Sequence, residues 1–364
     1  MSTLRGRTAE IETIEEFDRR VAGGVTSLAG WRLQDLDLRG RSDVLRRVDP
    51  HGALFLGCLI DAGVEDGLRA GGALVFPSVP DIPVDAYRPS LYTPQELYDG
   101  LATSYEQTLD ARVYAWAQRT GHDLYAALAQ SLHDLSVDDA LVELVRDRRL
   151  VGVMGGHALE RGSSAYADAA RLARSLTRAG LTVATGGGPG AMEAANLGAY
   201  LAGFDDPALD DALDLLAGAP GFEPSIGDWA EAAFAVLDRW PDGGSSLGVP
   251  TWFYGHEPPN AFASHIAKYF RNAIREDVLL HVCTAGIVFL PGRSGTVQEV
   301  FQDACENYYA DPGTVAPMVL VGTGFWTREL PVWPLLQTLA EGREMALRVH
   351  LVDDLDDVLP LLAV

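Results

Sequence analysis

The sequence predicts an α/β protein, with a Rossmann-like, doubly wound parallel sheet in residues 149–364 and a smaller α+β domain in residues 1–148. First, apolar runs alternate with amphipathic segments from Leu150 onward, a pattern typical of a parallel sheet covered by helices on both faces. Second, two of these runs lead directly into glycine-rich segments that open helices. Third, no such alternation precedes the charged stretch 146–149, which we interpret as the boundary.

The N-terminal region is expected to form a small domain, to which the sequence assigns no role. An acidic start predicts a helix, two apolar runs predict strands, and apolar residues at helical spacing predict further helix after a proline-rich stretch. In chain order, these segments are the helix at 11–21, the strands at 53–58 and 72–76, the proline-rich stretch at 77–94 and the helical segment at 94–129. No internal repeat is evident.

The C-terminal region is expected to alternate strand and helix. Ser163 or Ser164 can cap its first helix, which runs through Ala179 and ends at Gly180. The predicted strands are residues 150–154, 181–185, 246–252, 286–290, 318–321 and 348–352. The later predicted helices are residues 191–201, 262–281, 296–309, 328–341 and 354–362.

An acidic segment, residues 203–245, interrupts this alternation. It holds ten acidic residues and one basic residue, Arg239. Because acidic runs usually face water, we interpret the segment as a solvated helical insertion. A lid over a ligand is the alternative.

The composition excludes several classes of function. A formal net charge of -23 argues against nucleic acid as the main partner, because binding to a polyanion depends on many cationic side chains. No apolar run reaches 18 residues and the N-terminus has no apolar signal segment, so we expect a cytoplasmic protein that does not bind a membrane. The three cysteines are far apart and no pair has metal-ligand spacing, so neither a disulfide nor a metal is expected.

The first glycine signature, residues 185–193, follows the second predicted strand of this region. Backbone N–H groups in such a loop, together with the start of the next helix, suit a phosphate. We therefore predict nucleotide contacts from Gly155, Gly156, Gly186, Gly187, Gly188, Gly190, Met192 and Glu193. The alternatives are a tight turn without a ligand for the glycines and a charge at the helix start for Glu193. A dinucleotide fingerprint follows the first strand instead, so no nicotinamide or flavin cofactor is expected.

The second glycine signature, residues 291–299, follows the strand predicted at 286–290. It is not a Walker A loop, because no lysine precedes its threonine. Predicted phosphate contacts are Gly292, Arg293, Ser294, Gly295 and Thr296. Glu299 lies one helical turn further and is predicted to take part in chemistry, with a favourable charge near the helix start as the alternative.

Cations precede the second signature. Lys268, Arg271 and Arg275 are spaced by three and four residues, which would place them on one helix face, with His265 one turn earlier. A solvent-exposed basic stripe is the alternative for the first two. Arg275 is predicted to act at the site, because a guanidinium binds phosphate and carboxylate in a bidentate manner.

These motifs resemble the Lonely guy family, the cytokinin-activating nucleoside monophosphate phosphoribohydrolases, and the longer bacterial nucleotide 5'-monophosphate nucleosidases of the same fold. The matching segments are the glycine loop at 186–192, the PGxxGTxxE motif at 291–299 and an arginine in the preceding helix. Two positions differ from the family's pattern: Glu276 follows Arg275 where the family usually has lysine, and Arg293 replaces the second glycine of its PGG.

The resemblance implies hydrolysis of the N-glycosidic bond of a nucleoside 5'-monophosphate to free base and ribose 5-phosphate. It implies that Gly295, Thr296 and the triple glycine hold the 5'-phosphate. Glu299 would bind ribose hydroxyls, stabilise an oxocarbenium-like centre or orient the attacking water, and Arg275 would be the catalytic arginine. A homodimer or higher homo-oligomer is also implied.

The sequence therefore favours an enzyme acting on an AMP-like purine nucleoside monophosphate. The alternative is a non-catalytic sensor that binds a nucleotide or another phosphorylated metabolite in the same pocket. A DNA-processing protein is a third hypothesis, against which the net charge argues.

Overall fold

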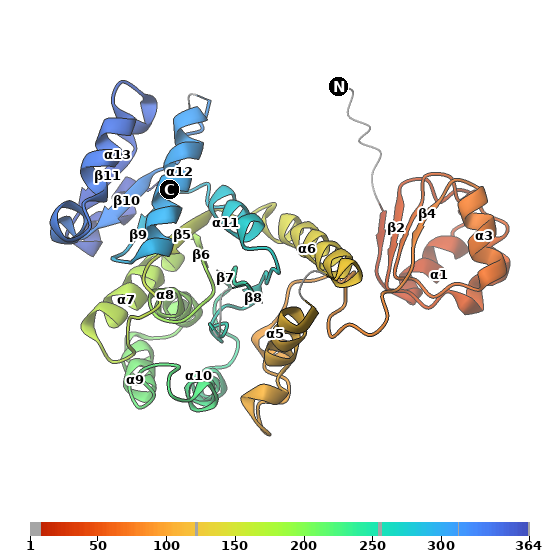
Figure 1. The fold of residues 1–364 in the computed structure, drawn as a ribbon, viewed down its shortest axis with the longest axis horizontal. Coiled ribbons are helices and arrows are strands. Elements are labelled where there is room, and N and C mark those ends of the chain that lie inside the picture. Colours follow the sequence, from red (N-terminus) through yellow and green to blue (C-terminus); the bar gives the residue numbers. More distant parts are fainter. Residues whose placement is uncertain (1–8, 121–122, 254–256, 312, 363–364) are drawn as a thin grey trace. The chain divides into compact units, whose positions relative to one another are not determined.

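A computed structural model of the chain describes residues 9–120, 123–253, 257–311 and 313–362. The chain divides into two compact units (Figure 1). Unit 1 comprises Met1–Ser90 with Trp116–Ala140, and unit 2 comprises Leu91–Ala115 with Leu141–Val364. The prediction of two domains that meet at residue 148 stays a prediction.

Unit 1 contains a sheet of four parallel strands in the order β1-β2-β3-β4. The strands are β1 (Ala9–Ile11), β2 (Trp31–Gln34), β3 (Leu54–Leu56) and β4 (Leu74–Phe76). Helices α1 (Ile14–Ala22), α2 (Ser42–Leu45) and α3 (Ala62–Ala70) fall between successive strands. Neighbouring strands in space are therefore also neighbours in sequence.

This sheet is a structural repeat that the sequence did not reveal. Ala9 pairs with Trp31, Arg32 with Leu54 and Leu54 with Leu74, so each turn of the chain advances by 20 to 22 residues. Stacking such turns buries one position per turn, and that column is Ile11, Leu33, Phe55 and Val75. These four residues share only apolar character, but a glycine with a positive φ recurs at the same register before three of the strands, at Gly30, Gly52 and Gly72.

Unit 2 contains a parallel sheet of seven strands in the order β11-β10-β9-β5-β6-β7-β8. The strands are β5 (Leu150–Met154), β6 (Thr182–Thr185), β7 (Leu247–Gly248), β8 (His265–Ile266), β9 (Ile287–Phe289), β10 (Met318–Val321) and β11 (Val349–Val352). The main helices are α7 (Ser164–Arg178), α8 (Ala191–Tyr200), α11 (Asn272–His281), α12 (Ser294–Tyr309) and α13 (Val332–Ala340). The predicted fold class, α/β with a doubly wound parallel sheet, is confirmed.

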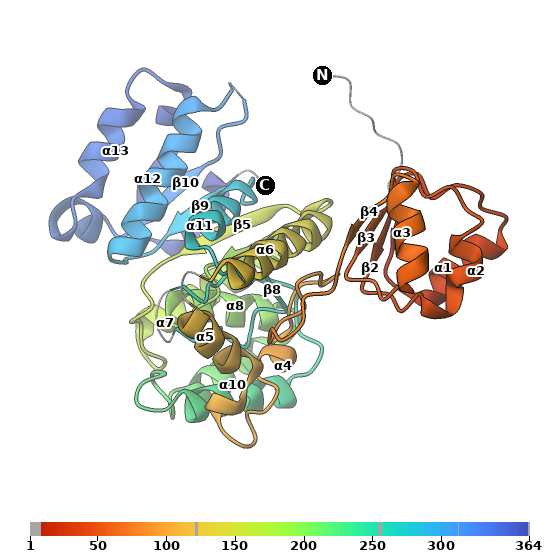
Figure 2. The same cartoon turned by 45° about the vertical axis from the view of Figure 1, so that its right-hand side comes forward.

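The strand order reverses between β5 and β9, which pair through Gly152–Ile287, Val153–Val288 and Met154–Phe289. From β5 the chain proceeds through α7 to β6, and from β9 it proceeds through α12 to β10 on the opposite side. Right-handed crossovers therefore place α7 and α8 on one face and α11, α12 and α13 on the other, as Figures 1 and 2 show. Ligands of open α/β sheets bind at the carboxyl ends of strands beside such a reversal.

Several predicted elements differ from the observed ones. The helix predicted at 262–281 begins only at Asn272, because His265 and Ile266 form β8 and pair with β7. Residues 354–362 form short 3-10 turns rather than one helix. The helix predicted at 94–129 is divided into α4 (Pro94–Leu97), α5 (Leu109–Thr120) and α6 (Leu124–Val145).

The acidic segment 203–245 forms two helices, α9 (Asp206–Leu216) and α10 (Ile226–Arg239). Their apolar residues, including Leu209, Leu216 and Val236, belong to the main core of unit 2. The segment is therefore a packed helical insertion. Within the part of the chain that the structure describes, no helix is long and apolar enough to cross a membrane.

Candidate functional site

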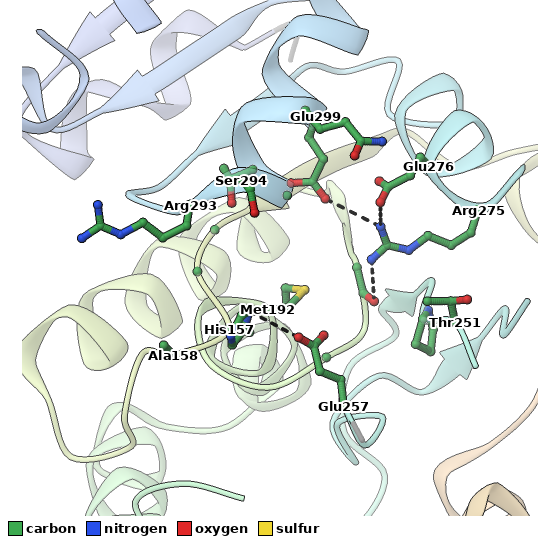
Figure 3. A pocket seen from close by; sticks show the side chains of 18 residues that line it. His157, Ala158, Met192, Thr251, Glu257, Arg275, Glu276, Arg293, Ser294 and Glu299 are labelled. Atoms are coloured by element: carbon green, nitrogen blue, oxygen red, sulfur yellow. Dashed lines mark hydrogen bonds and ion pairs between the residues drawn. The ribbon is translucent and has the colours of Figure 1, made fainter. Parts of the chain in front are cut away.

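A cavity of about 410 Å³ opens in unit 2 at the carboxyl ends of β5, β6 and β9 (Figure 3). It is lined by Gly155, Gly156, His157, Ala158, Gly186, Gly188, Met192, Pro250, Thr251, Glu257, Arg275, Glu276, Arg293, Ser294, Gly295, Thr296, Gln298 and Glu299. Both glycine signatures thus meet at one cavity, beside the point where the strand order reverses.

The first glycine loop packs tightly against the rest of the fold. Gly190 has a φ of 72° and precedes the first residue of α8, and a Cβ there would lie 2.5 Å from the carbonyl oxygen of Gly156. Gly187 has a φ of 73°, and its Cβ would lie 2.6 Å from Pro250. Only glycine fits either position. Neither residue lines the cavity, so these two glycines shape the loop, while Gly186 and Gly188 face the cavity.

A buried hydrogen-bond network supports this loop. Asn260 donates from its backbone to the Gly187 carbonyl, at 2.8 Å, and from its side chain to the Gly188 carbonyl, at 3.1 Å. The side-chain oxygen of Asn196 accepts from Thr185 and Asn260, at 2.7 and 3.0 Å. All three side chains are fully buried, so the conformation of the loop is fixed before any ligand arrives.

The second glycine loop ends at the N-terminus of α12. The first backbone N–H groups of a helix have no acceptor inside the helix, and the helix dipole adds partial positive charge there. A Cβ on Gly295 would meet no atom within 4 Å, whereas one on Gly292 would lie 2.1 Å from the Thr296 hydroxyl. Gly295, Ser294 and Thr296 therefore offer an open anion site, and Gly292 is required for packing.

The Arg293 side chain lies at the rim of the cavity and extends away from the other charged groups (Figure 3). It pairs with exposed Glu329 at 3.1 Å, and its guanidinium carbon lies 6.0 Å from the centre of the Phe325 ring. The extra bulk at this position is thus accommodated outside the anion site.

Arg275 lies between two buried carboxyl groups. Its Nη1 is 2.6 Å from Glu276 Oε1 and 3.8 Å from Glu299 Oε1 (Figure 3). Its Nε donates to the carbonyl of Val249 at 2.7 Å, and its Nη2 donates to the carbonyl of Gly186 at 3.4 Å. The guanidinium therefore connects α11, the first glycine loop and α12.

Glu299 is buried, with 7% of its surface exposed. Burial raises the pKa of Glu299 to about 8, with Arg275 lowering it and the negative charge of Glu276 raising it further. Desolvation is thus the dominant cause, since a buried carboxyl resists ionisation. Without a ligand, Glu299 is mostly protonated at neutral pH.

Glu193 lies away from the cavity. Its carboxylate pairs with Arg161, which donates to it from Nη2 and, at 3.0 Å, from Nε. Arg161 also donates to the carbonyl of Trp229 at 2.9 Å and lies over its ring. Both members of the pair are buried. The structure thus gives Glu193 a role that neither alternative named, a buried ion pair with Arg161, and a nucleotide contact stays a prediction.

The other cations predicted near the site lie apart from the cavity lining. His265 is in β8, Lys268 follows that strand, and Arg271 immediately precedes α11. They do not share a helix face, because the predicted helix is absent at 262–271. Buried Lys268 pairs with Asp110 at 2.6 Å.

Sequence reasoning missed seven residues of the lining, namely His157, Ala158, Pro250, Thr251, Glu257, Glu276 and Gln298. His157 pairs with Glu257 at 3.3 Å. Three of the seven carried a usable signal, since His157 follows Gly156, Glu276 is next to Arg275 and Gln298 lies inside the second signature. Among the described residues, no group of three or more His, Cys, Asp or Glu side chains could hold a metal ion.

Fold and cavity together define a parallel α/β protein with a cavity at the carboxyl edge of its sheet, lined by two glycine loops and a buried Glu-Arg-Glu group. No protein-family model and no curated protein sequence matches the chain. Among solved structures, the molybdenum cofactor binding protein from the phototrophic bacterium Rippkaea orientalis is similar, with 16% identity, a TM-score of 0.36, and coverage of 59% of this chain and 94% of that one. The Moco carrier protein from Chlamydomonas reinhardtii is similar at 18% identity, with a TM-score of 0.36 and coverage of 58% and 94%. At these values the similarity assigns no ligand and no activity to this chain.

Proposed function

We propose that the protein hydrolyses the N-glycosidic bond of a nucleoside 5'-monophosphate, releasing the free base and ribose 5-phosphate. The observation that carries this proposal is the convergence of both glycine loops, Arg275 and Glu299 on one cavity. The Lonely guy-like motifs point to the same reaction. We further propose that the protein acts in the cytoplasm as a homo-oligomer.

The 5'-phosphate belongs at the start of α12 and against the triple-glycine loop. Backbone N–H groups at Ser294, Gly295 and Thr296 and the dipole of α12 supply the positive potential. Glu299 lies on the first turns of the same helix, so a bound phosphate places the ribose near its carboxyl group.

Glycosidic cleavage develops positive charge at the sugar and negative charge on the leaving base. A carboxyl group near the sugar and a fixed arginine are the groups such a reaction requires, because they stabilise charge that appears only in the transition state. The hydrogen bonds from Arg275 to Val249 and Gly186 fix the guanidinium before substrate binds.

The direct test is release of free base. The protein is incubated with AMP, GMP, CMP, UMP and a cytokinin nucleotide, and products are separated by chromatography. We expect base and ribose 5-phosphate in equal amounts from at least one purine nucleotide. No base from any of the five contradicts the proposal.

A nucleotide sensor is a second candidate, favoured by one observation. Arg275 is already engaged by Glu276 and two backbone carbonyls, as a purely structural arginine would be. Glu299→Gln separates the two functions. Lost turnover with retained AMP binding supports the enzyme, whereas tight AMP binding by a wild type without turnover supports the sensor.

A further inference from the structure

Glu276 lines the cavity and carries a buried carboxylate oxygen to which none of the described protein groups is hydrogen-bonded. Its Oε1 accepts from Arg275, while its Oε2 has no hydrogen-bond partner among the described residues. The side chain is 4% exposed and lines the cavity beside Glu299. A buried oxygen without a partner is costly and requires an explanation.

We propose that Glu276 is a second catalytic carboxylate, which accepts the proton of the attacking water, while Glu299 acts as the acid that protonates the leaving base. The inference rests on the proposed hydrolysis. The resemblance alone gives activation of the attacking water to Glu299, whereas we assign that role to Glu276. Glu276 is also a position at which this chain differs from the family pattern.

The two carboxyl groups have different environments, although both lie beside the guanidinium of Arg275. Glu276 Oε1 lies 2.6 Å from Arg275 Nη1, close enough for a charge-assisted hydrogen bond. Glu299 lies at 3.8 Å from the same nitrogen, beyond hydrogen-bond distance. Two neighbouring carboxyl groups in unlike environments can serve as an acid and a base in one site.

The proposed step balances as follows. The O–H of Glu299 gives its proton to a ring nitrogen of the base as the C1'–N bond breaks and its electron pair moves to that nitrogen. A water oxygen forms a bond to C1', and its proton passes to Glu276 Oε2. Glu299 is then ionised and Glu276 protonated, and exchange of one proton with solvent restores both. Cleavage and hydration thus need no other reactant.

The charged groups around Glu299 agree with its role as the acid. Burial, opposed by Arg275 and aided by Glu276, raises the pKa of Glu299 to about 8. Asp303 lies one turn further along α12, and burial, with Glu306 adding to it, raises the pKa of Asp303. On the cavity side lie the His157–Glu257 pair and, at the rim, Arg293.

The experiment compares wild type, Glu276→Gln and Asp277→Asn across pH 5 to 10, with base release from the best nucleotide as the readout. The glutamine side chain of Glu276→Gln keeps the size of glutamate and an oxygen for Arg275 but cannot accept the proton of water. Asp277 is exposed on the same helix and is absent from the cavity lining, so it is the matched control. AMP binding and urea unfolding of each variant are measured alongside.

We expect wild-type kcat/KM to fall as pH rises through about 8, because Glu299 loses its proton there. In Glu276→Gln we expect kcat to fall by about 100-fold or more, in the range typical of losing a general base, with KM within about threefold. The alkaline fall should also move to lower pH, since the negative charge that raises the pKa of Glu299 is gone.

Three results bear on the inference in different ways. A Glu276→Gln variant within twofold of wild type overturns it while leaving the proposed hydrolysis intact. A loss of kcat that comes with an equal loss of AMP affinity or with unfolding at lower urea overturns it too, because a merely structural carboxylate would act in that way. A wild type that releases no base from any nucleotide overturns the hydrolysis itself.

Discussion

The free energy of unfolding is expected to depend on pH through the side chain of Glu299. The pKa of this buried carboxyl is raised from 4.5 to about 8, mainly by burial. Between those two values the folded protein holds a proton that the unfolded chain releases. The contribution of Glu299 to stability is therefore greatest below about pH 4.5 and declines as pH rises through 8.

Glu299→Gln should remove this dependence. Glutamine has the same size and carries no charge at any pH, so the variant should gain stability over wild type as pH rises, at about 1.4 kcal/mol for each unit up to pH 8. Urea unfolding of both proteins at pH 5 and pH 9 measures it. A stability difference that is equal at the two pH values would show that Glu299 ionises normally in the fold.

The Arg161–Glu193 pair should matter for stability rather than for ligand contact. Glu193→Ala leaves a buried guanidinium without its carboxylate, which typically costs about 3 to 5 kcal/mol. The exposed Arg239–Asp211 pair is the control, and Asp211→Ala should cost less than about 1 kcal/mol. Urea unfolding gives both values, and equal losses would contradict the structural reading of Glu193.

Glu193 and Glu299 also show what sequence can predict at a single residue. Both are acidic residues near the start of a helix that follows a glycine loop, so the local pattern treats them alike. Their fates differ because Arg161 lies 32 residues from Glu193 and folds back onto it. No local signal in the sequence reports that contact.

At the scale of elements, the glycines of the two loops divide into those that shape the fold and those that face a ligand. Gly190→Ala should be strongly destabilising, because its φ of 72° disfavours a side chain and the new Cβ would lie 2.5 Å from a carbonyl oxygen. Gly295→Ala should leave stability unchanged or slightly higher, because its Cβ enters open space in the first turn of a helix.

The same two variants should also differ in their affinity for AMP. The methyl group of Gly295→Ala occupies the anion site, so affinity for AMP should fall by about tenfold in a fold of normal stability, whereas Gly190→Ala should unfold at lower urea. Calorimetric titration with AMP and urea unfolding check the two outcomes. Unchanged AMP affinity in Gly295→Ala would place the phosphate elsewhere in the cavity.

Elements were well predicted where a strand and a helix each follow one strong pattern. The strands at Leu150–Met154 and Met318–Val321 coincide with the prediction, and Ser163 caps α7 as expected. The prediction failed at 262–271, where cations at helical spacing suggested a helix. Pairing of β8 with β7 decides the conformation there, and sheet pairing is a long-range contact that local spacing does not contain.

At the scale of the whole molecule, Asp110 ties an early segment of the chain to the sheet of unit 2. It accepts from the Trp252 indole at 2.7 Å and pairs with Lys268, the only lysine of the chain, at 2.6 Å. Tyr92 pairs with Ile266 through two backbone hydrogen bonds. Burial lowers the pKa of Lys268, and Asp110 opposes that effect, so the lysine depends on its partner.

The overall architecture was predicted because alternation of strand and helix determines a parallel sheet. The membership of Leu91–Ala115 in unit 2 was not, since composition changes at 146–149 while the contacts of Asp110 cross more than a hundred residues. The repeat of unit 1 was missed because its sequence signal is sparse: one glycine and one apolar position recur every 20 to 22 residues.

Two truncated chains test whether residues 91–115 belong to the folded unit that contains the sheet of unit 2. A chain that begins at Leu91 retains Asp110 and Tyr92, whereas one that begins at Arg149 removes the Asp110 carboxylate from Lys268 and from the Trp252 indole. We expect residues 91–364 to fold cooperatively and bind AMP, and residues 149–364 to aggregate or unfold at markedly lower urea, because an unpaired buried charge is strongly destabilising. Adding Lys268→Met to the shorter chain should restore part of the lost stability by removing that charge. If residues 149–364 unfold at the same urea concentration as residues 91–364, the segment 91–115 is dispensable and a boundary at residue 148 is the better description of the chain.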